Sequence, residues 1–107
     1  MTPEQKTILK NAIKQFGVPE QLDMAIEECA ELIQAINKIK RWKLVFPIHI
    51  KKPTYDTRQV LAYHTLCSEV ADVKIMMAQL EIMLDSEIIQ TCLDRKIERL
   101  NNKFNGF

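Results

Sequence analysis

Apolar residues recur at intervals of three and four along most of this chain, the spacing that places them on one face of an α-helix. The first such segment starts at Thr2 followed by Pro3, because proline is favoured at the first position of a helix, and it ends at Gly17. Its expected apolar face consists of Ile8, Ile13 and Phe16.

The second segment is longer and leads into a connection rich in helix breakers. It begins at Pro19 and keeps its helical spacing to about Trp42. Pro47 and Pro53 interrupt the residues that follow. Proline lacks the amide hydrogen that a helix interior needs, so we expect a loop insertion at about 43–56.

Two further helices are expected in the second half of the chain. Asp56 is a suitable N-cap for a helix that continues to Leu84, and Asp85 or Ser86 can cap a last helix that ends near Phe104. Four helices with mostly short connections predict an all-α fold, an antiparallel four-helix bundle. The two central helices are apolar over wide arcs, so we expect a homodimer or homotetramer that buries the excess.

The composition narrows the class of protein. At 107 residues the chain builds one core, so residues 1–107 form a single domain, and 47% hydrophobic and 27% charged residues are typical of a globular protein. There is no apolar run of membrane-spanning length and no signal-peptide pattern, so we expect a cytoplasmic protein that does not bind membranes. A net charge of +1 gives no overall attraction to a nucleic acid polymer.

Carboxylates occupy positions on two helices where the spacing predicts core residues. Glu28 and Glu69 lie on the apolar stripes of their helices, and Glu31 and Asp72 flank those stripes. Most acids lie on solvated faces, which is the alternative interpretation. Four acids that converge between packed helices repel one another, and a hard divalent cation offsets that repulsion. Mg²⁺ is the natural ion for oxygen ligands, and Mn²⁺ is also suitable.

The same residues resemble the signature of a known family. An E-E-x-x-E motif followed by E-x-x-D is similar to the pattern of the MazG-type all-α nucleoside triphosphate pyrophosphohydrolases, and the similarity extends over most of the chain. The signature positions are Glu27, Glu28, Glu31, Glu69 and Asp72. On the last helix, Lys96 and Arg99 follow the family's order.

The resemblance implies an enzyme that hydrolyses a (d)NTP to a (d)NMP and pyrophosphate with Mg²⁺. The implied metal ligands are Glu28, Glu31, Glu69 and Asp72. Glu27 and Glu31 are the candidates for a general base. Lys96 and Arg99 would neutralise the polyphosphate, and the alternative for both is a solvated face that pairs with neighbouring acids.

Two departures from the family's pattern limit what the resemblance implies. The connector between the two acidic motifs is long for the family, which suggests an inserted loop. Leu100 stands where the family often has a second arginine, and Lys103 is a candidate to replace it. Trp42 is a candidate for stacking on a nucleobase, although an aromatic residue at a helix end often simply packs.

Other functions fit the same acids. An all-α dUTPase-like enzyme or a phosphoribosyl-ATP pyrophosphohydrolase-like enzyme would use them for related substrates. A non-catalytic helical dimerisation or regulatory module would retain them as vestiges or for a structural ion. No P-loop and no nucleophile elbow occurs in the sequence.

Overall fold

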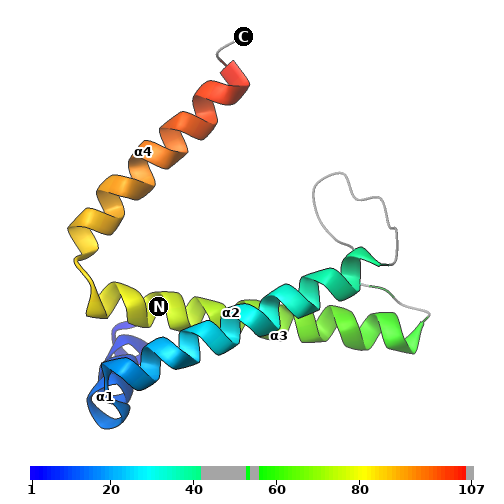
Figure 1. The fold of residues 1–107 in the computed structure, drawn as a ribbon, viewed down its shortest axis with the longest axis horizontal. Coiled ribbons are helices and arrows are strands. Elements are labelled where there is room, and N and C mark those ends of the chain that lie inside the picture. Colours follow the sequence, from blue (N-terminus) through cyan, green and yellow to red (C-terminus); the bar gives the residue numbers. More distant parts are fainter. Residues whose placement is uncertain (42–52, 54–55, 106–107) are drawn as a thin grey trace.

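The computed structural model describes residues 1–41, 53 and 56–105, and the regular structure in these residues is entirely helical (Figure 1). The helices are α1 (Pro3–Phe16), α2 (Val18–Lys40), α3 (Thr57–Met83) and α4 (Ser86–Asn105). The predicted all-α class is therefore confirmed. Trp42 and most of the loop expected at 43–56 lie outside the described residues.

Side-chain caps fix the starts of α1 and α3. The amide of Gln5 donates to Thr2 Oγ1 at 3.1 Å, and the amide of Thr2 donates to Gln5 Oε1 at 2.9 Å, which is a capping box. At α3, Asp56 Oδ1 accepts from the amides of Arg58 and Gln59. These caps satisfy amides that have no partner inside the helix, so the ends are encoded locally.

A single residue, Gly17, joins α1 to α2. Its φ of +88° with ψ of 154° is a conformation that side-chain-bearing residues rarely adopt, and glycine adopts it without strain. The amide of Gly17 donates to the carbonyl of Ile13 at 2.9 Å, which ends α1. The elbow turns α1 so that it contacts both α2 and α3.

The core lies mainly between α2 and α3. Figure 1 shows these two long helices side by side and running in opposite directions. Alanine provides much of the buried surface, at Ala25 and Ala35 of α2 and at Ala62 of α3, together with Ile39 and Met76. Small side chains allow the two backbones to approach closely.

The helix α1 is rotated from the orientation that its sequence suggested. Leu9 is its buried residue, with Ala12 and Ile13 half-buried beside it, whereas Ile8 and Phe16 are exposed. Ile13 was thus placed correctly, but Ile8 and Phe16 were not. Leu9, Ala12 and Ile13 are spaced by three and four residues, so they form an equally regular face, and the contact with α2 and α3 selects it.

The helix α4 leaves the end of α3 and extends away from the other helices (Figure 1). It contacts α3 but neither α1 nor α2. Asp85 Oδ1 caps it by accepting from the amides of Glu87 and Ile88 at 2.9 and 3.2 Å. Of its side chains, Ile89 is half-buried and the others are exposed. A bundle of four helices is therefore not closed by α4 within one copy of the chain.

Among the described residues, no helix is both long enough and apolar enough to cross a membrane.

Candidate metal centre

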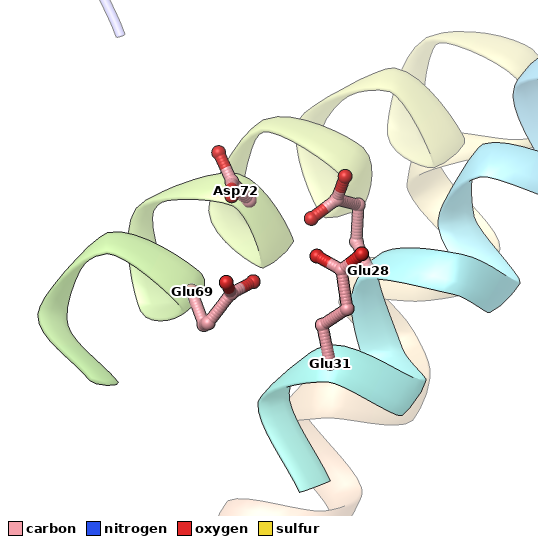
Figure 2. A group of neighbouring side chains, drawn as sticks. All are labelled: Glu28, Glu31, Glu69 and Asp72. Atoms are coloured by element: carbon pink, nitrogen blue, oxygen red, sulfur yellow. The ribbon is translucent and has the colours of Figure 1, made fainter. Parts of the chain in front are cut away.

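Four carboxylates meet where α2 and α3 face each other. Figure 2 shows Glu28 and Glu31 on α2 opposite Glu69 and Asp72 on α3. Each residue offers one carboxylate oxygen, and these four oxygens lie within 4.8 Å of one another. The spacing of three residues on each helix places each pair of acids about one turn apart, so two helical turns supply the whole cluster.

The positions of Glu28 and Glu69 along their helices place both residues on the faces that meet at the α2–α3 interface. Glu28 shares its face with the buried Ala35, one heptad further along α2. Glu69 shares its face with the buried Ala62, one heptad earlier in α3. Both glutamates are half-buried, as is Asp72, and Glu31 lies at the exposed edge of the cluster.

Two carboxylate oxygens of the cluster are buried without a hydrogen-bond partner in the described part of the chain. Glu28 Oε2 and Glu69 Oε2 are hidden from solvent and accept no hydrogen bond within the described part of the chain. Buried polar atoms in native proteins nearly always have a partner, and such an exception calls for an explanation. A bound cation would satisfy both atoms and compensate their charge.

The cluster also changes how its acids titrate. Partial burial raises the pKa of Glu28 above its ordinary value of 4.5, and the negative charges of Asp72, Glu31 and Glu69 raise it further. The pKa of Glu69 is raised by its burial and then by the charges of Glu31 and Asp72. In the absence of a cation and at a pH just above 4.5, the folded chain therefore binds protons at these two residues more strongly than the unfolded chain does.

The geometry of the cluster fits a hard divalent cation. Opposite ligands in an octahedral Mg²⁺ site are about 4.2 Å apart, twice the usual metal–oxygen distance. The four carboxylate oxygens lie within 4.8 Å of one another, close to that spacing, and rotation of the flexible side chains can bring them onto one ion. Mn²⁺ takes the same ligands. Ca²⁺ also takes oxygen ligands, at longer metal–oxygen distances of about 2.3–2.6 Å.

The structure brings together some of the predicted site residues and not others. All four predicted metal ligands belong to the cluster, including Glu31, which is also a candidate base. Glu27 is exposed and is not a member of the cluster. Lys96 and Arg99 are exposed on α4, which does not contact α2, so one copy of the chain does not place them at the acids. Trp42 lies outside the described residues.

A hollow of about 340 Å³ beside the cluster was not anticipated from the sequence. Leu32, Val70 and Val73 line it, and each of them directly follows an acid of the cluster. Lys74 of α3 also borders this hollow. The only signal in the sequence was that apolar residues adjoin the acidic motifs, which by itself does not distinguish a hollow from a packed core.

Comparisons with known proteins identify no similar protein. No protein-family model, curated protein or solved structure gives a significant match to this chain. The cluster is therefore interpreted from its own geometry.

The stability of the metal-free protein should depend on pH through Glu28 and Glu69. Their pKa values are raised on folding, so the folded state binds more protons than the unfolded chain between pH 4.5 and the raised values. The free energy of unfolding should therefore fall as the pH rises through this range and level off above it.

The double variant Glu28→Gln, Glu69→Gln should lack this pH dependence, because neither glutamine titrates. The advantage of this double variant over the wild type should widen from pH of about 4 to about 7, measured by urea unfolding in EDTA. Parallel pH profiles for the two proteins would show that the carboxylates do not interact in the fold.

A divalent cation should stabilise the protein, because it binds the folded state and not the unfolded chain. At a concentration about a hundred times the Kd, the melting temperature of a domain of this size should rise by on the order of 10 °C. We expect the rise with Mg²⁺, Mn²⁺ and Ca²⁺. It should be strongly reduced in Glu69→Gln and retained in Glu81→Gln, an exposed acid of the same helix. Equal melting temperatures in EDTA and in millimolar Mn²⁺ would contradict a metal site.

Proposed function

We propose that this chain is a metal-dependent nucleoside triphosphate pyrophosphohydrolase of the MazG type. The observation that carries the proposal is the group of four carboxylates at the α2–α3 interface, two oxygens of which are hidden from solvent and have no hydrogen-bond partner among the described residues. The sequence motifs that resemble this family are the ones that supply the group. Mg²⁺ is the proposed cofactor and Mn²⁺ its substitute, and we expect the enzyme to be cytoplasmic and to act as a homodimer or homotetramer.

The chemistry is an in-line displacement in which water attacks the α-phosphorus of the nucleotide. The new P–O bond belongs to the nucleoside monophosphate, and the bond to the bridging oxygen breaks, so this oxygen leaves with pyrophosphate. When bound, the divalent cation supplies positive charge to the phosphate oxygens and lowers the pKa of nearby water. A reaction of this type depends on positioning and charge neutralisation, which a set of fixed carboxylates and cations provides.

The proposal gives distinct roles to the acids. Glu28, Glu69 and Asp72 hold the cation through their carboxylate oxygens, with Glu31 at the exposed edge. We favour Glu31 over Glu27 as the general base, because Glu31 belongs to the group of acids that would hold the cation and Glu27 does not. A carboxylate oxygen of Glu31 would take the proton from the attacking water.

The predicted products are a nucleoside monophosphate and pyrophosphate. We expect this outcome with Mg²⁺ or Mn²⁺ on one or more members of a panel of NTPs, dNTPs, dUTP and phosphoribosyl-ATP, analysed by chromatography. In ¹⁸O-water the label should enter the monophosphate, because the attack is at the α-phosphorus. Glu69→Gln should lose at least two orders of magnitude in kcat, while Glu81→Gln should keep wild-type turnover.

The result of the product assay separates the candidate functions. Turnover restricted to dUTP or to phosphoribosyl-ATP would assign the substrate to one of the related enzymes. Orthophosphate as the primary product would contradict the proposed reaction. Stabilisation by metal without turnover on any nucleotide would indicate a non-catalytic helical module with a structural ion.

Lys96 is the cation that we expect to contact the polyphosphate, from an α4 that packs along α2 and α3. Loss of a charge-assisted hydrogen bond should lower kcat/KM of Lys96→Ala by roughly 10- to 100-fold, through KM, kcat or both. Arg95→Ala is the matched control, since Arg95 is an exposed base on another face of α4. Equal losses in the two variants would assign the effect to the net charge of the helix, and no loss in Lys96→Ala would remove this residue from the site.

A further inference from the structure

The helix α4 carries an apolar stripe that no other described part of its own chain covers. Leu93, Ile97, Leu100 and Phe104 follow one another at intervals of three and four, so they share one face. They are 48%, 57%, 49% and 76% exposed. A surface helix normally buries such a stripe against a core.

The complementary surface is a groove along α2 and α3. It has a volume of about 690 Å³ and an almost entirely apolar lining. Leu22, Ile26 and Ile33 of α2 form one wall, and Met77 and Leu80 of α3 form the other. Ile26 and Ile33 are 69% and 60% exposed, so the side chains that line the groove are themselves in need of a partner.

The helix α4 of the same copy is held away from this groove. Only Leu84 and Asp85 connect α3 to α4, and both are fixed by hydrogen bonds. The amide of Leu84 donates to the carbonyl of Leu80 at 2.9 Å, and Asp85 Oδ1 caps α4. Figure 1 shows that α4 points away from the α2–α3 pair. A helix from a second copy is under no such restraint.

The surface involved is large enough for a stable pair. Full burial of one large apolar side chain removes roughly 60–120 Å² from water. The stripe and the groove together offer about ten such side chains, each now about half exposed. In a reciprocal exchange the stripe of each copy meets the groove of the other, so this burial occurs twice. The exchange therefore buries on the order of 1,000 Å² of apolar surface, the scale of a specific protein–protein interface.

We propose that two copies of this chain exchange their α4 helices, each laying the stripe of its α4 into the α2–α3 groove of the other. The pair has twofold symmetry and closes on itself, because each copy offers one helix and one groove. In the pair, the α4 of each copy covers the α2–α3 groove that is exposed in a single copy. The exchange does not depend on the proposed reaction, since it involves neither the acids nor a nucleotide, and it specifies how the homodimer expected under the proposed function would pack.

The first test measures the mass of the purified, full-length chain in solution by size-exclusion chromatography with light scattering. Wild type should have at least twice the mass of one chain at tens of micromolar. Ile97→Asp, on the stripe, and Ile26→Asp, in the groove, should each be monomeric. Asn102→Asp places the same charge on the opposite face of α4 and should keep the wild-type mass. Circular dichroism should show that all variants retain their helices.

The second test detects the exchange directly through cysteines that the chain already carries. Cys29 lines the groove and Cys92 is exposed on α4. One protein retains Cys29 alone, a second retains Cys92 alone, and the others are replaced by serine. When the two are mixed and treated with a short bismaleimide, a cross-linked pair of unlike chains should form. Adding Ile97→Asp to the Cys92 protein should abolish it.

Three outcomes would overturn the proposal. The first is a monomeric wild type, which would mean that α4 folds onto its own groove or stays free. The second is an oligomer that survives Ile97→Asp but not Ile26→Asp, because the grooves would then pack directly on each other. The third is an oligomer that gives no cross-link between unlike chains.

Discussion

Repulsion among four carboxylates at the contact of α2 and α3 is the constraint on which the rest of the structure depends. Glu28 and Glu69 occupy inward positions that an apolar residue would fill at less cost, and their raised pKa values express that strain. The two helices nevertheless form the main contact of the chain. A bound divalent cation would change this repulsion into attraction, so the packing of the core and the proposed chemistry would depend on the same four side chains.

The ends of the helices could be read from the sequence because their causes are local. Thr2 and Asp56 accept hydrogen bonds from amides two and three residues away, and Gly17 adopts a conformation that favours glycine. The rotation of α1 could not be read in the same way. Ile8 and Leu9 are neighbours of similar character, and only contact with α2 and α3 decides which of them is buried. The direction in which α4 leaves α3 also could not be read from the periodicity of its residues.

The acidic cluster was predictable for a similar reason, and the rest of the site was not. A spacing of three residues on an inward stripe determines where Glu28, Glu31, Glu69 and Asp72 point once the helices pair. Glu27 precedes Glu28 by one residue, which rotates it about a quarter-turn away from the pairing face. Lys96 and Arg99 belong to a helix whose neighbours are not determined by its own sequence. Short-range periodicity gives orientation around a helix axis, but it does not give the partner of the helix.

The alanines of the core influence the distance between the carboxylates of the acidic site. Ala35 lies seven residues from Glu28 and Ala62 seven residues from Glu69, each on the face that α2 and α3 share. With so little side chain between them, the two helices lie close together, and their separation limits the distances that the carboxylates can reach by side-chain rotation. Ion preference in this protein would then be governed by residues that never touch the ion. A broader residue at either alanine would widen the span and favour a larger cation, with every ligand unchanged.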